Sequence, residues 1–457
     1  MTANHTAELA TFTAGLEYDA IPSTTRDRVI QIVVDSVASA VIGRTGGEIR
    51  HIENLALNLG GEGSATVVGA PQRLSMIGAV LVNGYQTTAV NVCDVFHPAH
   101  CHITPEVLPP AIAVGENIHA SGKQFLTSVT AGLETVCRVG VALNFSAFRE
   151  RGWHAPGVIG PFGGAAAVAR LLDLDAEGHR NALGLAGSQS GGTIAQWGTP
   201  TIKFHQARGS MSGLVAGLLA SEGYVAGDNV LSNPSGGILS TFSDGGNPEA
   251  LTAGLGENWE LEKISLKRWP SGSGVQTTVS SLFAIIEAHD VKPEDVERLT
   301  IYLPSGAYKL HGPMGWDKKF NAMLSARYIA SVVLHDRRCW VDQYADDRRT
   351  DPSVDAFARD RVEVIEDPGL ATTATVTEVY LKDGTVIRDA RDRPKGDPED
   401  PYSLEDTIDK LEDASRGILA PERMQRGLEG LLNLEQVDDI APVFRQFSTS
   451  EPAAALG

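Results

Sequence analysis

The segment from Asn91 to Pro105 concentrates side chains that can exchange protons near neutral pH. It carries one carboxylate, three imidazoles and two thiols in a single short run. Pro98 and Pro105 lack a backbone N–H and disfavour helical geometry in the residues before them. We therefore predict a loop between the apolar stretches Ile77–Ala89 and Val107–Val114, and loops held by helices are common positions for catalytic groups.

The three histidines of this segment, His97, His100 and His102, are open to three interpretations. They could bind zinc, but their spacing matches neither an HExxH helix nor paired CxxC sites, so we predict no metal. They could instead cap helices and satisfy backbone groups. We favour acid–base or substrate-binding use, because Asp94 and the histidines of one loop can hold protons of different affinity near neutral pH.

A second candidate is His154, which lies in the glycine-rich stretch Gly152–Gly164 just before a run of small residues. A glycine-rich approach to a helix N-terminus can bind an anion, because free backbone donors point outward there. No strand precedes it, which disfavours a dinucleotide-binding fingerprint. The alternative is close helix packing around a buried histidine.

Basic residues form a third feature, in the stretch Thr199–Arg208. Lys203 and His205 alternate around Phe204, so both could face one cavity. Lys267 and Arg268, which precede the sequence Trp-Pro-Ser-Gly-Ser-Gly, add further positive charge. A single Lys or Arg is usually an isolated surface cation. Their coincidence with histidine-bearing segments instead favours a pocket for an anionic substrate.

The overall charge limits the possible partners. The 457-residue chain has a formal net charge of −19 and no cluster of basic residues, which argues against nucleic acid and anionic membranes as partners. Hydrophobic residues make up 42% and charged residues 21%, as in ordinary globular proteins, and no apolar run is long enough to span a membrane.

The location expected from the sequence is cytoplasmic. The stretch Met1–Glu17 lacks the basic and apolar regions of a secretory signal. The four cysteines show neither CxxC spacing nor a disulfide-dense pattern, which favours a reducing compartment.

The elements that position these residues are predominantly helical as far as about Leu266. Ser23 can cap a helix over Arg26–Ile42, whose apolar residues recur at helical spacing. The runs Gly163–Ala169 and Ser212–Ala220 are apolar nearly all round and rich in small residues, which predicts central helices that approach each other closely.

Residues 267–402 read as a separate α+β domain, and the helical tail Leu404–Phe447 is expected to pack back on the first domain. We thus predict a mainly α protein, with a helical domain from residues 1–266 and 403–457. The turn Lys382–Gly384 predicts a hairpin, and Ala390–Tyr402 an exit linker. The other elements expected in the second domain are helices over Val275–His289 and Met323–Leu334, and strands over Val296–Leu303, Ala374–Leu381 and Thr385–Ile387.

Taken in order, the motifs resemble those of the 2-methylcitrate dehydratase family, also called the MmgE/PrpD family, over nearly the whole chain. The segments that carry the resemblance are Val82-Asn83-Gly84, the block from Asp94 through His102 to Val107-Leu108-Pro109, Gly152-Trp153-His154 through Gly163, Asn181-Ala182-Leu183-Gly184, Lys203-Phe204-His205 and Leu266-Lys267-Arg268-Trp269-Pro270.

The resemblance implies a large all-helical domain built from both chain ends, a smaller α+β lid, an active site in the cleft between them, a homodimer, and no metal or other cofactor. It also implies activity on compact polycarboxylates, since family members dehydrate 2-methylcitrate, decarboxylate cis-aconitate or epimerise iminodisuccinate. A proton next to a carboxylate becomes acidic only when cations neutralise the developing charge, which explains a need for Lys, Arg and His.

Site residues follow from matching the motifs position by position. The catalytic positions are Asp94, His102, His154, Lys267 and Tyr328. The substrate-binding positions are His97, Lys203, His205, Arg208 and Arg268. In these roles His154 and His102 share proton transfer, and Asp94 orients them or acts as a base.

The chain also departs from the family pattern. Asn91-Val92-Cys93-Asp94-Val95 stands where Asp-Phe-Asp-Asp-Thr is common, the His97–His102 loop is one residue longer, and Ile202 and Gln276 replace a lysine and a histidine. We expect a hydro-lyase acting on a small hydroxylated di- or tricarboxylate such as 2-methylcitrate or a citrate analogue. The alternatives are an epimerase, isomerase or decarboxylase of a related acid, or a non-catalytic carboxylate-binding protein.

Overall fold

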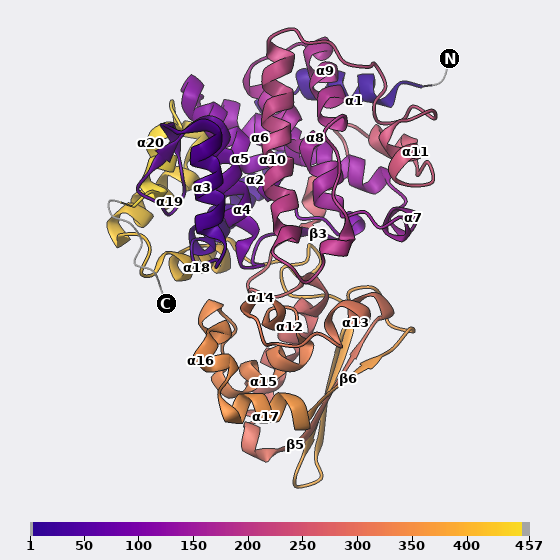
Figure 1. Cartoon of the computed structure of the whole chain (residues 1–457), viewed down its shortest axis with the longest axis vertical. Helices are drawn as coiled ribbons and strands as arrows, with labels where there is room; N and C mark the ends of the chain where they lie inside the picture. Colours follow the sequence, from indigo (N-terminus) through magenta and orange to yellow (C-terminus); the bar gives the residue numbers. More distant parts are fainter. Residues whose placement is uncertain (1–2, 450–457) are drawn as a thin grey trace. The chain divides into compact units, whose positions relative to one another are not determined.

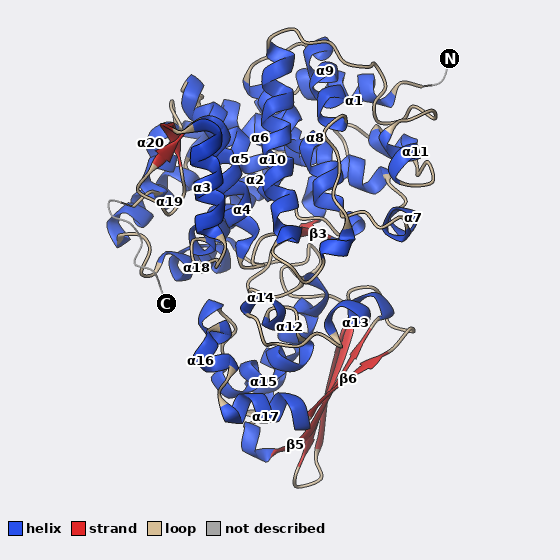
Figure 2. Cartoon of the chain, viewed as in Figure 1, coloured by secondary structure: helices blue, strands red, loops and turns tan. Residues whose placement is uncertain are grey.

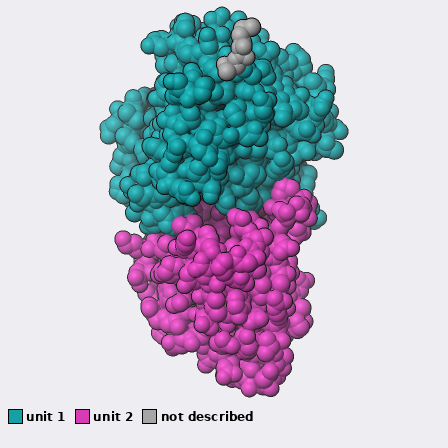
Figure 3. Space-filling view, turned by 90° about the vertical axis from the view of Figure 1, so that its right-hand side faces the viewer, with its two compact units in different colours: residues 1–89, 93–265, 403–457 teal, residues 90–92, 266–402 magenta. Residues whose placement is uncertain are grey.

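The computed structural model of the protein describes residues 3–449. The fold is mainly α, with 59% of residues in helices. Two compact units can be distinguished (Figure 3). Unit 1 contains Met1–Ala89, Cys93–Ser265 and Ser403–Gly457, and unit 2 contains Val90–Val92 and Leu266–Tyr402.

Unit 1 is a layered helical body (Figure 1). Its helices are α1 (His5–Ala14), α2 (Ser23–Gly43), α3 (Ile49–Gly60), α4 (Met76–Ala89), α5 (Thr104–Ile118), α6 (Gly122–Ala142), α7 (Phe145–Glu150), α8 (Ala155–Leu171), α9 (Ala176–Gly187), α10 (Thr201–Ser221), α11 (Ile238–Phe242), α18 (Leu404–Ser415), α19 (Pro421–Leu432) and α20 (Ala441–Phe444). It is not all-helical as expected, because it also holds the short antiparallel pairs β1 (Glu62–Thr66) with β2 (Arg73–Leu74), and β3 (Val95–Phe96) with β4 (Ile264–Ser265).

The centre of unit 1 is the contact between α8 and α10, which carry the two predicted runs of small residues. A Cβ atom added at Gly213 of α10 would lie 2.8 Å from the Cα atom of Gly164 in α8. That distance is too short for any side chain, so glycine is required where the two backbones meet. The prediction of closely approaching central helices is therefore confirmed.

The C-terminal helices belong to the same body as the N-terminal ones. Helix α18 packs on α2, and the Lys410 ammonium lies 2.6 Å from the Asp35 carboxylate in a wholly buried ion pair. The expected return of the tail to the first domain is confirmed. The predicted cap of α2 is wrong: Ser23 is its first helical residue, and Pro22 precedes it without a side-chain cap.

Unit 2 is an α+β body whose helices cover one face of a four-stranded sheet (Figure 2). The strand order is β6-β5-β7-β8, with β5 and β6 parallel and the other neighbours antiparallel. The strands are β5 (Val296–Leu303), β6 (Val362–Glu366), β7 (Thr375–Leu381) and β8 (Val386–Arg391). The helices are α12 (Gln276–His289), α13 (Ser305–His311), α14 (Lys319–Ala322), α15 (Ala326–Asp336), α16 (Asp346–Arg349) and α17 (Pro352–Asp360).

Most of the predicted elements of unit 2 are confirmed, with shifted limits. The hairpin between β7 and β8 turns at Gly384, whose φ of 90° suits glycine. Helix α15 begins at Ala326 rather than Met323, because the Ser325 hydroxyl accepts the Tyr328 N–H and caps it there. The predicted linker begins too early, since Ala390 still belongs to β8.

Candidate active site

His154 and His205 form an imidazole pair inside unit 1. His154 directly precedes α8, and His205 lies in the first turns of α10. Their Nδ1 atoms are 3.0 Å apart, and only 6% and 8% of the two residues is exposed. One of the two nitrogens must carry the hydrogen, because a contact this short requires a donor and an acceptor.

Both imidazoles are held in the neutral form. Burial lowers the pKa of His154 well below its ordinary value, and the charges of His205, Arg149 and His102 lower it further. Burial likewise lowers the pKa of His205, with a contribution from Arg208. A neutral pair sharing one hydrogen can accept a proton at neutral pH, as a general base must.

Glycines around the pair allow the backbone to approach it closely. The His154 N–H donates to the Gly192 carbonyl at 2.9 Å. A Cβ atom at Gly192, whose φ is 144°, would lie 3.0 Å from His205 Nδ1. A Cβ atom at Gly157 would lie 2.3 Å from the Gly191 carbonyl oxygen. These glycines thus serve close packing around His154, the alternative that the sequence left open.

Arg208 directs its guanidinium at the backbone. It donates to the carbonyl oxygens of Gln189, Gly157 and Gly191 at 2.6, 2.9 and 2.6 Å. The Gly157 carbonyl accepts Arg208 and the Gly191 N–H because Pro161, four residues further along α8, has no N–H to donate. Arg208 therefore fixes the backbone of residues 189–191 beside the imidazole pair. A substrate carboxylate would have to compete with three carbonyl groups for the Arg208 guanidinium.

Lys203 is buried in the first turn of α10, where its ammonium donates to the Ala89 carbonyl. The alternation of Lys203 and His205 around Phe204 assumes an extended chain and is wrong, because the segment is helical. Two residues along an α-helix are rotated by about 200° relative to each other. The two side chains accordingly reach different neighbours.

Asp94 is wholly buried and holds the start of α5. Its carboxylate accepts the Ile103 and Thr104 N–H groups at 2.8 and 3.2 Å and the Thr104 hydroxyl at 2.5 Å. Burial raises the pKa of Asp94, although the hydrogen bonds from Thr104 and Ile103 oppose the shift. In this structure the carboxylate therefore orders the loop that carries the histidines.

His102 is partly exposed and lies near the end of that loop. Its Nδ1 atom donates to the Asp94 carbonyl oxygen at 2.6 Å, since a carbonyl can only accept. The neutral ring then carries its hydrogen on Nδ1 and its lone pair on Nε2. The Asp94 carbonyl therefore fixes the orientation of the His102 ring.

His97 and His100 lie on the short 3-10 turn after β3 (Val95–Phe96). His97 is partly exposed, whereas His100 stacks on Phe145 with ring centroids 4.5 Å apart. His100 has a φ of 42°, an uncommon left-handed conformation for a histidine. Burial and the charges of His97 and Arg149 lower the pKa of His100 to about 4.

The predicted site residues of unit 2 have partners within that unit. The buried Lys267 ammonium donates to the Asn91 carbonyl at 2.7 Å, and the Arg268 guanidinium lies 5.9 Å from the Trp340 ring centroid. Segment 90–92 is thus part of unit 2, although the sequence analysis placed it in the helical domain.

Tyr328 is wholly buried in α15. Its hydroxyl donates to the Gln343 carbonyl, and its ring packs near Trp316 and Tyr344. Burial raises the pKa of the Tyr328 hydroxyl above its ordinary value. The hydroxyl therefore serves the interior of unit 2, and its catalytic use stays a prediction.

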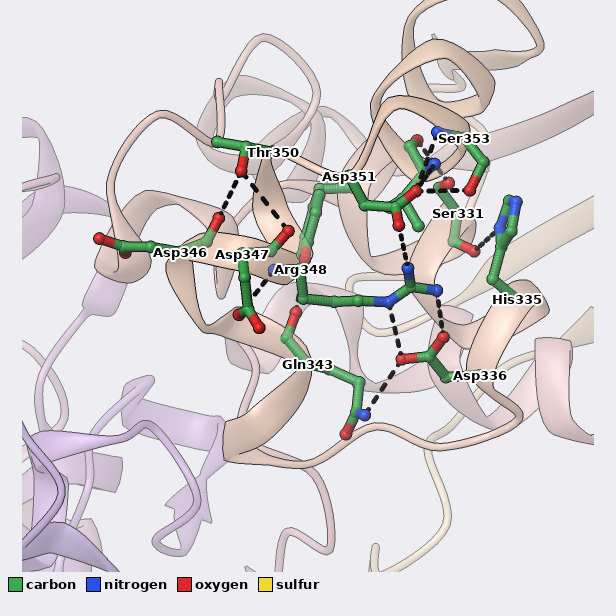
Figure 4. A network of polar contacts seen from close by, with 12 residues as sticks. Ser331, His335, Asp336, Gln343, Asp346, Asp347, Arg348, Thr350, Asp351 and Ser353 are labelled. Atoms are coloured by element: carbon green, nitrogen blue, oxygen red, sulfur yellow. Dashed lines mark hydrogen bonds and ion pairs between the residues drawn. The ribbon is translucent and has the colours of Figure 1, made fainter. Parts of the chain in front are cut away.

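A polar network around Gln343 holds this region of unit 2 together (Figure 4). Asp336 accepts the Gln343 amide and the Arg348 Nε atom, both at 3.1 Å. Arg348 also pairs with Asp351 at 3.0 Å. The network thus fixes the segment that supplies the acceptor for the Tyr328 hydroxyl.

Two charged residues that the sequence analysis did not select have unusual surroundings in unit 1. Glu106 in α5 is wholly buried, and neither carboxyl oxygen has a hydrogen-bond partner among the described residues. Burial, and then the charge of Asp94, raise the pKa of Glu106 well above its ordinary value. Arg149 in α7 is the second. Glu106 lies inside the motif block that ends at Val107-Leu108-Pro109, but its apolar neighbours do not single it out, and Arg149 lies in a short charged stretch outside the motifs.

Within residues 3–449, no three His, Cys, Asp or Glu side chains converge as metal ligands would. Metal independence itself stays a prediction. Among the described helices, α6 (Gly122–Ala142) alone is long and apolar enough to cross a membrane, and 94% of its most apolar window is buried inside the protein, as in a core helix.

Comparisons with known proteins agree over almost the full chain. Residues 7–251 match the MmgE/PrpD N-terminal domain, and residues 269–436 match the MmgE/PrpD C-terminal domain. Cis-aconitate decarboxylase of Aspergillus terreus is 26% identical over 467 residues, covering 96% of this chain and 94% of the relative. Cis-aconitate decarboxylase of Mus musculus is 26% identical over 436 residues, covering 91% and 87%.

A third relative, the cis-aconitate decarboxylase-like protein oryM of Aspergillus oryzae, is 26% identical over 477 residues and covers 97% of both chains. The N-terminal match alone spans more than half of the chain, and the two domain matches occur in the order that the motifs indicated. The chain belongs to the MmgE/PrpD family.

Proposed function

We propose that the protein is a lyase that acts on a small di- or tricarboxylate without a cofactor. The observation that carries this proposal is the buried, neutral pair of His154 and His205. Family membership supports the substrate class, since relatives along the whole chain are named as cis-aconitate decarboxylases.

The proposed reaction begins with proton removal. A neutral imidazole accepts the proton from a carbon next to a carboxylate, and the electron pair moves onto the carboxylate. That developing charge needs a cation, and buried Lys203 is the one we assign to it. The electron pair then returns to form a carbon–carbon double bond, and the hydroxyl group on the neighbouring carbon leaves as water with the proton that the imidazole had accepted.

Dehydration is the reaction that the imidazoles favour. Dehydration begins with proton removal, and a neutral imidazole is the acceptor that this step needs. Decarboxylation is the second candidate, and the names of the relatives favour it. It begins with loss of carbon dioxide and afterwards needs a proton donor, which a neutral imidazole is less suited to be.

Product identification tests the proposal. The enzyme is incubated with citrate, 2-methylcitrate and cis-aconitate, and the mixtures are followed by proton NMR. An unsaturated acid formed from a hydroxy acid supports dehydration, and carbon dioxide release with a shortened acid supports decarboxylation. Stereoisomers without loss of any group would identify an epimerase. Binding of all three acids without turnover would contradict an enzymatic role and indicate a carboxylate-binding protein.

A further inference from the structure

Arg149 is a half-buried cation for which the described part of unit 1 supplies no acidic partner. It lies in α7, three residues before Gly152 in the turn that follows. Its Nη1 atom is fully buried and has no hydrogen-bond partner among the described residues. Burial lowers the pKa of Arg149, and no carboxylate acts against that shift. A charge left in this state destabilises a protein.

The surroundings of Arg149 are aromatic and basic. Its guanidinium carbon lies 5.2 Å from the centroid of the Phe145 ring, the same ring on which His100 stacks. The charge of Arg149 reaches both His100 and His154, where it contributes to their lowered pKa values. The stack with Phe145 shields the guanidinium from water but does not neutralise its charge.

The turn after α7 connects this cation to the imidazole pair. The Gly152 N–H donates to the Arg149 carbonyl at 2.9 Å, and Gly152 has a φ of 84°, which reverses the chain. Two residues later His154 begins the approach to α8. Arg149 and the proposed base are therefore held on one short, turned segment.

An anion from outside the chain accounts for this arrangement. In a protein with a net charge of −19, a half-buried guanidinium without a carboxylate partner is unexpected unless its partner arrives with a ligand. Guanidinium groups bind carboxylates through two parallel hydrogen bonds, which is why Arg is common where carboxylates are recognised. We propose that Arg149 binds one carboxylate of the substrate beside His154.

This inference rests on the proposed function and adds a specificity residue to it. A second carboxylate at Arg149 distinguishes di- and tricarboxylates from simpler acids, because a ligand with one carboxylate cannot satisfy both Arg149 and the buried Lys203. The carboxylate site assigned to Arg149 thus determines which class of substrate binds, and it adds no step to the reaction.

Calorimetric titration with tricarballylate, an unreactive tricarboxylate, tests the inference. Arg149→Gln should weaken binding by roughly tenfold or more, since a charge-assisted pair is lost. Arg149→Lys should recover part of the loss. The matched control is Arg151→Gln, because Arg151 is exposed and donates to the Ser240 and Thr241 carbonyls at 3.3 and 3.0 Å. It should change the affinity less than twofold.

Two results without ligand belong to the same test. Arg149→Gln should raise the melting temperature, because an unpaired buried charge is removed, whereas a structural arginine would lower it. The pKa of His100 is about 4 in the wild type. It should rise in Arg149→Gln, because a nearby positive charge is removed, and it should be unchanged in Arg151→Gln.

The failures can be told apart. Equal tricarballylate binding by wild type and Arg149→Gln, or a lowered melting temperature, would overturn the role of Arg149 and leave the proposed function standing. Failure of the wild type to bind tricarballylate would overturn both.

Discussion

At the scale of single residues, the proposed function depends on an imidazole that stays neutral while enclosed by protein. His154 meets this condition because burial and nearby positive charges act on its pKa in the same direction. The 3.0 Å contact with His205 fixes the orientation of its ring. The Asp94 carbonyl fixes the orientation of the His102 ring. In the proposed function, the pair of His154 and His205 removes the proton.

His154→Ala should reduce kcat with little change in substrate affinity. A positioned acid–base group typically supplies about 10²–10⁴-fold in rate, so a loss of this order is expected. Steady-state kinetics and a binding titration on the same preparation separate the two effects. His51→Ala, at an exposed position of α3, is the control and should leave kcat unchanged. Full turnover in His154→Ala would mean that His154 is only a packed core residue.

Lys267→Ala should fail in a different way. A lysine that holds a carboxylate in the ground and transition states contributes to binding, so its loss should weaken binding by roughly 1.5–3 kcal/mol. KM should rise while kcat changes little, as measured by steady-state kinetics. Lys292→Ala, at an exposed position, is the matched control. A lowered kcat at unchanged KM would instead give Lys267 a role in the chemical step.

Glu106 predicts a pH dependence of stability. Its raised pKa means that the folded protein holds a proton that the unfolded chain loses above its ordinary pKa of 4.5. The stability from this group is complete below that pH and is lost as pH rises toward the folded pKa. Glu106→Gln should therefore raise the free energy of unfolding at pH 8 and have much less effect near pH 4.

Urea unfolding at several pH values measures this effect. Glu412→Gln, at an exposed position of α18, controls for the loss of one acidic group and should give the wild-type pH dependence. A Glu106→Gln variant that is less stable than wild type at pH 8 would show that the carboxylate has a partner and is ionised.

At the scale of elements, unit 1 is closed by a contact between distant parts of the chain. The ion pair of Lys410 in α18 and Asp35 in α2 is 2% exposed on each side. Removing one partner of such a pair leaves an uncompensated buried charge. The C-terminal helices are therefore needed for the stability of the helical body.

Lys410→Met should cost about 3–5 kcal/mol of unfolding free energy, the usual loss when one partner of a buried pair is removed. Lys263→Met removes an ion pair with Glu260 in which the lysine side chain is 56% exposed, and should cost less than about 1 kcal/mol. Denaturant unfolding of both variants gives the comparison. Similar losses in the two variants would show that the Lys410 pair is no stronger than a surface pair.

The spacing of apolar residues predicted an element well where only one pattern, helical or alternating, was present. Residues Val296–Leu303 alternate, and β5 has these limits in the structure. Strand β6 (Val362–Glu366) was not predicted, because it is short, lies at the sheet edge and pairs in parallel with a strand far away in sequence. Alternation misled at Lys203 and His205, since a three-residue pattern does not distinguish a strand from the first turn of α10.

For the candidate site, the sequence predicted which residues take part but not the contacts between them. The sequence motifs indicated that His154, His205 and Asp94 carry chemistry, but not that two imidazoles meet or that Asp94 caps α5. Those contacts depend on helices brought together by tertiary packing. The sequence does not single out Arg149 or Glu106, because their significance lies in the partners that they lack in the described structure.

At the scale of the whole molecule, the proposed function needs only the side chains of the protein itself. The described chain offers no converging set of three His, Cys, Asp or Glu ligands. Dialysis against a strong chelator should therefore leave turnover unchanged, as measured with an active substrate before and after treatment. Activity lost on dialysis and restored by a divalent metal would contradict this expectation. Restoration by one metal alone would indicate a specific site.

The central claim is that the pair of His154 and His205 moves a proton at a carbon next to a carboxylate. Incubation with an active polycarboxylate in deuterated water, followed by NMR, tests it most directly. We predict that the wild type introduces deuterium at that carbon in recovered substrate or in product. His154→Gln, which keeps the size of the side chain, should lose this incorporation while it still binds the ligand. Deuterium incorporation at the wild-type rate in His154→Gln, or turnover by the wild type without exchange at that carbon, would contradict the claim.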